Sequence, residues 1–98
     1  MADTSPNGTD RFIDNTDQSR FELHVDGHMA IADYFRRDGV LTLPHVEADT
    51  PLRGTGAASR LMEQVTAAAR ADGAKIRPLC SYAVAWMRRH PEASDLLA

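Results

Sequence analysis

The chain has very little cysteine and no long apolar run. Cys80 is the only cysteine among its 98 residues, which excludes an internal disulfide framework and favours a reducing compartment. No apolar stretch approaches the length of about 20 residues that crosses a bilayer. Residues 1–19 have neither the apolar core nor the basic start of a secretory signal. We therefore predict a soluble, cytoplasmic protein that does not associate with a membrane.

Aromatic residues are also scarce, at 6% of the chain, and basic side chains are not interleaved with them. The formal net charge is −3, yet the segment 53–91 carries seven Lys and Arg side chains against two acidic ones. This segment could face an anion, although arginines on helices are commonly only solvated. Nucleic acid is disfavoured as a partner, because surfaces that bind it usually combine basic with aromatic side chains.

Residues 1–19 differ in composition from the rest of the chain. They hold four aspartates against one arginine, and Phe12 and Ile13 are their main apolar side chains to bury. A segment with so little to bury is typical of disorder. We predict a disordered acidic tail over residues 1–19 and one domain over residues 20–98, long enough for a single modest core.

Three antiparallel strands are predicted near residues 20–26, 29–36 and 39–47. The run "FELHV" alternates apolar and polar residues, as a half-buried strand does. Asp26-Gly27 and Asp38-Gly39 supply the residue pairs that type I′ hairpin turns prefer. Pro44 cannot donate a hydrogen bond to a neighbouring strand, so we expect a bulge or an unpaired side there.

The second half of the chain predicts helix, strand and helix. "AASRLMEQVTAAARAD" has helical spacing and stops at Gly73. "AKIRPLC" reads as a short strand, and "SYAVAWMRRH" as a helix capped by Ser81 and ended by Pro91. The order β-β-β-α-β-α predicts an α+β fold with a mixed sheet, in which a right-handed crossover adds a parallel strand to the meander.

The stretch "TPLRGTGAASRLMEQ" places two glycines and Arg53 directly before the first helix. The first amides of a helix have no partner within it, and its dipole is positive at that end, so an anion could bind there. The stretch lacks the Gly-Lys-Ser/Thr of a Walker loop and the third glycine of a dinucleotide fingerprint. ATP hydrolysis and dinucleotide binding are therefore disfavoured.

"RGTGAA" fits the Arg/Gln-x-x-Gly-x-Gly/Ala pattern of the GNAT superfamily of N-acetyltransferases. Further motifs follow in the order seen in its short stand-alone members: "HVE" at 45–47, "LRGTG" at 52–56, "PLCSY" at 78–82 and "RHPE" at 89–92. Residues 20–97 therefore resemble that short, compact GNAT-like family. The resemblance implies acetyl-CoA as cosubstrate, bound between the strands at 39–47 and 74–80 where their carboxyl ends part.

The resemblance also implies which residues hold the cosubstrate. The pyrophosphate would rest on the amides of residues 54–58 beside Arg53, and the pantetheine arm would pair with the backbone around Val46. Arg88 and Arg89 could reach the phosphates or be only solvated. The full set is Val46, Arg53, Gly54, Thr55, Gly56, Ala57, Ala58, Tyr82, Arg88 and Arg89.

Three residues are candidates for the chemistry. Cys80 is either a nucleophile that takes the acetyl group or a buried thiol beside the thioester. His45 and Glu47 lie on one face of a strand and could accept the proton of an incoming ammonium, or be only solvated. Tyr82 stands where most short members have Phe, so a general-acid role for it is open. The four histidines show no metal-ligand spacing, and we expect no metal.

Two classes of function remain. The first is an acetyl-CoA-dependent N-acetyltransferase that acts on a small amine or on a protein amino group. The second is an acyl-CoA-binding module or sensor with little catalysis. Larger GNAT enzymes continue with strands that help bind the acceptor, so here we expect a shallow acceptor site or one that a partner protein completes.

Overall fold

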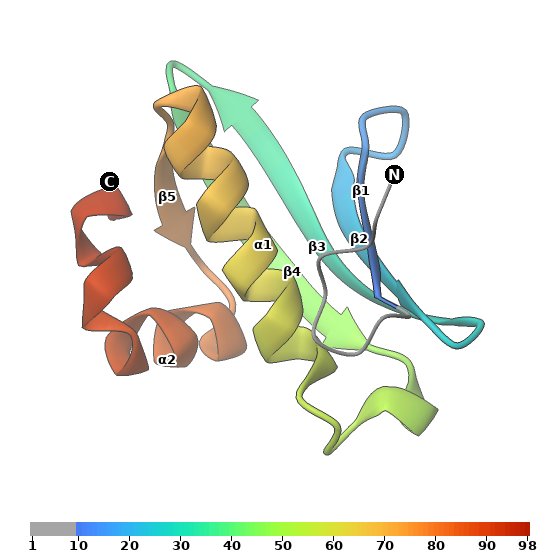
Figure 1. Cartoon of the computed structure of the whole chain (residues 1–98). Coiled ribbons are helices and arrows are strands. Elements are labelled where there is room, and N and C mark those ends of the chain that lie inside the picture. Colours follow the sequence, from blue (N-terminus) through green and yellow to red (C-terminus); the bar gives the residue numbers. More distant parts are fainter. Residues whose placement is uncertain (1–9) are drawn as a thin grey trace.

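The computed structural model describes residues 10–98, which form a five-stranded sheet with two α-helices (Figure 1). The strands are β1 (Arg11–Asn15), β2 (Arg20–Val25), β3 (His28–Arg37), β4 (Val40–Ala48) and β5 (Lys75–Pro78). The helices are α1 (Ala57–Asp72) and α2 (Ser81–Arg89), with 3-10 turns η1 (Thr50–Leu52) and η2 (Pro91–Leu96). The strand order is β1-β2-β3-β4-β5, with β4 and β5 parallel and the other pairs antiparallel. The predicted α+β fold with a mixed sheet is confirmed.

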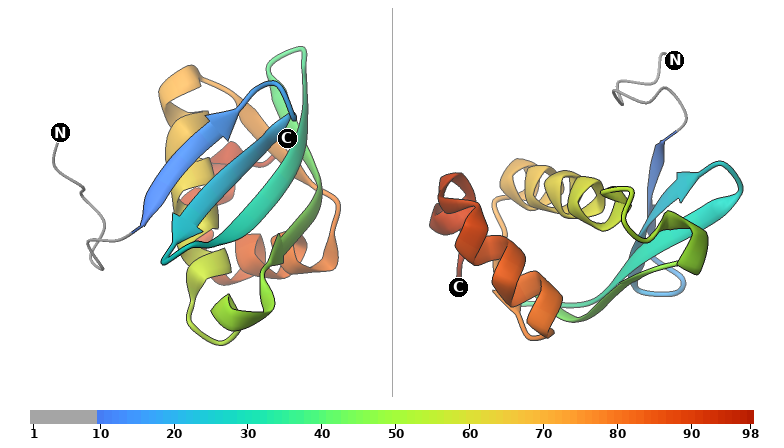
Figure 2. Two further views of the ribbon diagram at one scale, coloured as in Figure 1. Left: turned by 90° about the vertical axis from the view of Figure 1, so that its right-hand side faces the viewer. Right: turned by 90° about the horizontal axis from the view of Figure 1, so that it is seen from below.

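The core lies between one face of the sheet and α1 (Figure 2). Alternation in β2 buries Phe21, Leu23 and Val25 on this face, as the sequence predicts. The buried face of α1 is made of Ala57, Leu61, Met62, Val65, Thr66 and Ala69. α2 adds Ala83, Trp86 and Met87 beside α1 and the β4–β5 end of the sheet. The two Asp-Gly turns have positive φ at both residues, as type I′ turns require.

The structure differs from the sequence prediction in residues 11–19, which belong to the fold. β1 pairs with β2 in register from Arg11↔His24 to Asn15↔Arg20. The ring of Phe12 stacks on that of Phe21, with centroids 5.6 Å apart. The pairing of five residues with β2 and the burial of an aromatic face stabilise this segment in the fold. Disorder was predicted from its polar composition alone, which does not reveal these contacts. Residues 1–9 of the predicted tail lie outside the described residues.

A bulge in β4 separates two halves of that strand. Asp33 of β3 pairs with His45, and Phe35 pairs with Thr42. Two steps along β3 therefore correspond to three along β4, which places one extra residue of β4 near Pro44. The bulge predicted from Pro44 is confirmed. Because of the extra residue, Leu43 and Val46 are both buried although they lie three positions apart. β4 therefore bends where its pairing with β5 ends.

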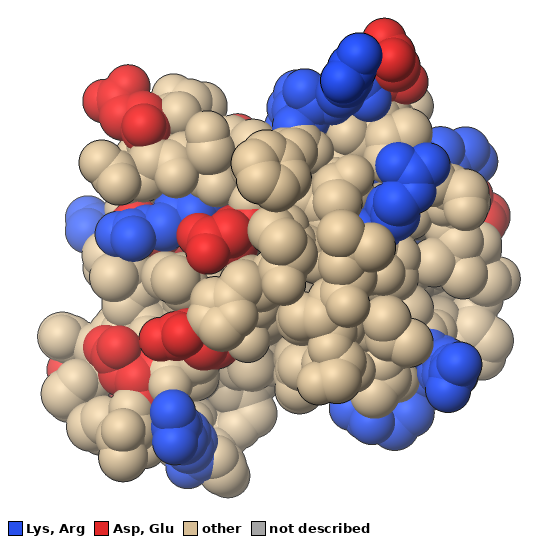
Figure 3. Space-filling view, turned by 180° about the vertical axis from the view of Figure 1, so that it is seen from behind, with Lys and Arg blue, Asp and Glu red and all other residues tan. Residues whose placement is uncertain are grey.

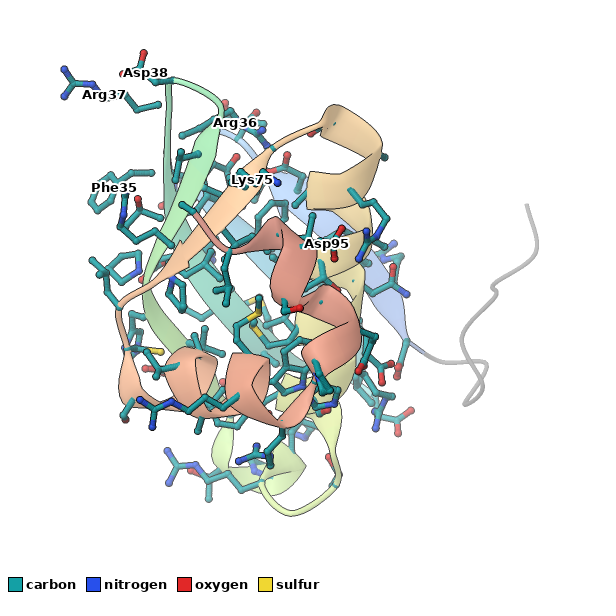
Figure 4. The ribbon with its side chains drawn as sticks, turned by 90° about the vertical axis from the view of Figure 1, so that its left-hand side faces the viewer. Phe35, Arg36, Arg37, Asp38, Lys75 and Asp95 are labelled. Atoms are coloured by element: carbon teal, nitrogen blue, oxygen red, sulfur yellow. The ribbon has the colours of Figure 1, made fainter. Side chains whose placement is uncertain are left out.

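The C-terminal segment Pro91–Leu96 closes the β5 end of the molecule, an element that the sequence reading did not predict. The Lys75 ammonium donates to the Asp95 carbonyl at 2.7 Å, and the Ala98 amide donates to the Ile76 carbonyl at 2.9 Å. The Arg70 guanidinium donates hydrogen bonds to the Asp95 carboxylate, and these hold the pKa of Asp95 below its usual value. Lys75 and Asp95 lie together in Figure 4, whereas Arg37 and Asp38 extend outward at the β3–β4 hairpin.

Candidate active site

A groove of about 360 Å³ opens where β4 and β5 part. The two strands pair from Val40↔Lys75 to Leu43↔Pro78, and the amides of Leu79 and Cys80 both donate to the Leu43 carbonyl. Beyond that point, the side of β4 that faces away from β3 has no strand partner in residues 10–98. The groove is lined by Val46, Glu47, Ala48, Leu52, Arg53, Gly54, Gly56, Ala57, Ala58, Ser59 and Tyr82.

The glycine turn forms the floor of the groove at the amino end of α1. Gly54 and Gly56 have φ of +80° and +84°, a left-handed conformation that residues with side chains rarely adopt. Within residues 10–98, the backbone amides of Gly54, Gly56, Ala58 and Ser59 donate to no acceptor. These amides stand at the positive end of the helix dipole, which is a favourable place for an anion.

Two of the five amides expected to hold phosphate are already engaged. The Thr55 amide donates to the Leu52 carbonyl at 3.1 Å, and the Ala57 amide donates to the Thr55 hydroxyl at 3.3 Å. The Thr55 side chain faces a second hollow, on the other side of the turn, instead of the groove. The free donors therefore differ from the predicted set by the loss of Thr55 and Ala57 and the gain of Ser59.

Arg53 lies at the rim of the groove and is exposed. Its Nε donates to the Ala48 carbonyl at 3.4 Å, which links the end of β4 to the glycine turn. The rest of its guanidinium faces solvent beside the free amides, so it adds a positive charge next to them.

His45 and Glu47 project from the same side of β4 as a bonded pair. The His45 Nε2 and a Glu47 carboxylate oxygen lie 2.5 Å apart, and about half of each side chain is exposed. Alternation with the buried Val46 points both away from α1, toward the open face of the sheet. Seen from behind, this face carries its charged side chains mainly around the rim (Figure 3). Glu47 also lines the groove, so the pair bridges the groove and the open face.

Cys80, and not Ser81, is the residue that caps α2. Its Sγ accepts a hydrogen bond from the Ala83 amide at 3.3 Å, and the thiol is partly buried against the core. An extended backbone with φ of −77° and ψ of 152° places the side chain over the first turn of the helix. Cys80 does not line the groove, although it lies two residues before Tyr82, which does.

Tyr82 enters the groove from α2 and stays protonated at neutral pH. Partial burial raises the pKa of Tyr82, while the nearby Arg89 and Ser59 oppose that rise. Ser59 lines the groove as well, and its Oγ accepts a hydrogen bond from Trp86 Nε1 at 2.9 Å. Sequence reasoning missed Ser59, because nothing in its spacing distinguishes it from the other polar residues of the helix.

Arg88 and Arg89 lie in the last turn of α2 and are exposed. Neither lines the groove, although Arg89 is close enough to influence Tyr82. The adjacent His90 stacks on Trp86, with ring centroids 3.7 Å apart, and bonds the Trp86 carbonyl at 2.7 Å. The "RHP" segment therefore holds Trp86, and through it Ser59, in place.

Comparison with known families agrees with this geometry. A family model described as GCN5-related N-acetyl-transferase matches residues 20–96, which is most of the chain. The chain belongs to this family. The match confirms the resemblance read from the motifs, and an acyltransferase is the activity that membership indicates. No curated protein gives a significant match to the chain.

The parts of the candidate site gather at one end of the sheet. The groove, the free amides and the His45–Glu47 pair all lie where β4 bends away from β5.

Within residues 10–98, no three His, Cys, Asp or Glu side chains are grouped as metal ligands. Across the same residues, no helix is long and apolar enough to span a membrane.

Proposed function

We propose that the protein is an acetyl-CoA-dependent N-acetyltransferase whose acceptor is an amine. The observation that carries this proposal is the groove itself. It joins an unpaired strand side to four free amides at a helix amino end, which together match a ligand that has both an amide-containing arm and a pyrophosphate.

The residues of the groove divide the binding between them. The amides of Gly54, Gly56, Ala58 and Ser59 would donate to the pyrophosphate, with Arg53 adding charge. The unpaired side of β4 around Val46 would pair with the amides of the pantetheine arm, as an added strand does. Arg88 and Arg89 lie outside the groove, so they would interact only with a phosphate of CoA that extends beyond it.

The His45–Glu47 pair supplies a base on the side from which an acceptor can approach. An ammonium must lose a proton before its nitrogen can attack the thioester carbonyl, and this exposed pair can accept it. When the carbon–sulfur bond breaks, Tyr82 can donate its phenolic proton to the leaving sulfur. The acceptor would reach the groove from the open face of the sheet. Phe35, 65% exposed, lies nearer the β3–β4 hairpin than the groove (Figure 4).

Direct attack by the amine is the route that we propose, with an acyl-Cys80 route as the second candidate. The observation in favour of the second route is that the Cys80 sulfur lies at the start of α2, where it accepts a hydrogen bond from the Ala83 amide. Against this, Cys80 lies outside the lining of the groove. The alternative of a binding module without catalysis would leave the His45–Glu47 pair without a role.

The test is turnover with a panel of primary amines, from diamines to lysine peptides, followed by release of the CoA thiol. We expect acetyl transfer well above hydrolysis for at least one class of amine, and a loss of about 100-fold in kcat for Glu47→Gln. Glu92→Gln, which alters an exposed carboxylate in η2, is the matched control. Tight CoA binding with no transfer to any amine would favour the binding module.

A further inference from the structure

Asp10 and Arg60 form a largely buried ion pair next to the glycine turn. Asp10 directly precedes β1 and is 6% exposed, an unusual position for an aspartate. Its carboxylate accepts from Arg60 Nε at 2.6 Å and from Arg60 Nη2 at 3.3 Å. The pair joins residues 50 positions apart in sequence, and it connects the start of β1 to the first turns of α1.

Arg60 also holds the turn itself. Its Nη1 donates to the Thr55 carbonyl at 3.0 Å, and its backbone amide donates to the Gly56 carbonyl at 3.0 Å. Arg60 and Thr55 line the hollow of about 430 Å³ on the side of the turn opposite the groove. The guanidinium therefore binds the turn from behind, that is, from the side opposite the groove.

One of these bonds fixes the direction of an amide in the groove. Thr55 C=O and Gly56 N–H belong to the same peptide unit, which is trans, so they point in opposite directions. While Arg60 holds the Thr55 carbonyl behind the turn, the Gly56 amide must point to the groove side. If this unit flipped, a carbonyl oxygen would face an anionic ligand and repel it.

We propose that Asp10 is a positioning residue for the anion-binding turn: it directs Arg60 to the Thr55 carbonyl and thereby keeps the Gly56 amide aimed into the groove. The inference deepens the proposed function and rests on it, because the anion is taken to be the pyrophosphate of CoA.

The experiment compares Asp10→Asn with Asp14→Asn. Asp14 is the matched control, because it lies on β1 close to Asp10 in sequence and accepts a hydrogen bond from the Tyr34 hydroxyl at 2.7 Å, away from the turn. The Kd of CoA is measured by calorimetry and the melting temperature in parallel. Asp10→Asn should weaken CoA binding about tenfold or more, as expected for loss of a charge-assisted bond, and Asp14→Asn should change it by less than about twofold.

A charge swap separates positioning from stability. Asp10→Arg combined with Arg60→Asp restores an ion pair, but an aspartate at position 60 cannot donate to the Thr55 carbonyl. We expect the double variant to recover melting temperature relative to Arg60→Asp while CoA binding stays weak. Recovery of both quantities, or an unchanged Kd in Asp10→Asn, would overturn the positioning role.

If the wild-type protein does not bind CoA, the proposed function fails and the inference is judged on the free protein. The Gly54, Gly56 and Ala58 amide resonances in a ¹⁵N spectrum then decide. Shifts of these resonances in Asp10→Asn but not in Asp14→Asn support the positioning role. Equal shifts in both variants, or none in either, overturn it.

Discussion

At the scale of single residues, Gly56 and Gly73 stand at opposite ends of α1 with similar left-handed backbones, at φ of +84° and +69°. Replacing either with Ala should cost about 1 kcal/mol or more of unfolding free energy, because a Cβ disfavours this conformation. Only Gly56→Ala should also weaken CoA binding, since a relaxed turn no longer aims its amides together. Denaturant unfolding and CoA titration of both variants check this, and equal loss of affinity in both would contradict it.

The surroundings of Gly56 show what a side chain at this position would meet. A Cβ there would lie 3.5 Å from Arg60 Nη1, on the side where the Thr55 carbonyl is held. That distance is an ordinary van der Waals contact, so the expected harm comes from backbone strain at the positive φ of this position.

Cys80 offers a second residue-scale prediction. Under direct attack, Cys80→Ala should keep kcat within about tenfold of wild type, whereas an acyl-enzyme route would lose orders of magnitude. Cys80→Ser is the control for capping: a serine caps α2 well, so it should preserve stability, while Ala should lower it by about 1 kcal/mol. Steady-state kinetics with thermal melts distinguish the routes, and a collapse of kcat in both variants would establish the covalent one.

At the scale of elements, β1 shows what sequence patterns cannot reveal. Its turn to β2 contains no glycine, and Ser19 adopts a φ of +53° that its identity does not suggest. The strands at 20–25, 28–37 and 40–48 were predictable because Asp-Gly pairs mark their turns. The contacts of Phe12 and Asp14 with β2 and β3 are tertiary, and they have no local signature in the sequence.

Removal of residues 1–19 should therefore lower the melting temperature markedly, contrary to what their composition suggests. The deletion takes away β1, the Phe12–Phe21 stack and the Asp14–Tyr34 hydrogen bond. Phe12→Ala alone should cost about 1–3 kcal/mol of unfolding free energy, since the ring is only partly buried. A truncated protein that melts like the full chain would show that β1 does not contribute to stability.

The outer face of β2 gives an element-scale pH prediction. Hydrogen bonds from Arg20, Asn15 and His24 lower the pKa of the buried Glu22 from 4.5 to about 2. Because the folded pKa lies below the unfolded one, the stabilisation is complete above about pH 5 and is lost as the pH falls toward 2. Solvent screening around its partly exposed partners limits this stabilisation to the order of 1 kcal/mol.

Glu22→Gln tests this assignment. The variant should be less stable than wild type at pH 7, and the difference should shrink steadily as the pH is lowered from 5 to 2. Glu63→Gln, on the exposed side of α1, is the control. A stability difference that is constant across this range would mean that the charge of Glu22 is not what stabilises the sheet.

At the scale of the whole molecule, the site arises where sheet, turn and helices meet. Motifs locate the glycine turn and the His45–Glu47 pair, because both depend on residue types at fixed spacing. They do not show that Thr55 and Ala57 amides are occupied, or that Ser59, Ala48 and Leu52 line the groove. Those facts depend on backbone direction and on the divergence of β4 from β5, which only the assembled fold determines.

The most direct test of the central claim is an NMR titration of the ¹⁵N-labelled protein with CoA and with acetyl-CoA. The largest shifts should fall on the amides of Gly54, Gly56, Ala58 and Ser59, with the backbone of residues 46–48 next. The single tryptophan adds an internal report, because the Trp86 indole N–H is bonded to Ser59 and should shift with them. Shifts concentrated instead in the turns at 26–27 or 38–39, with the residues of the groove unchanged, would contradict the account.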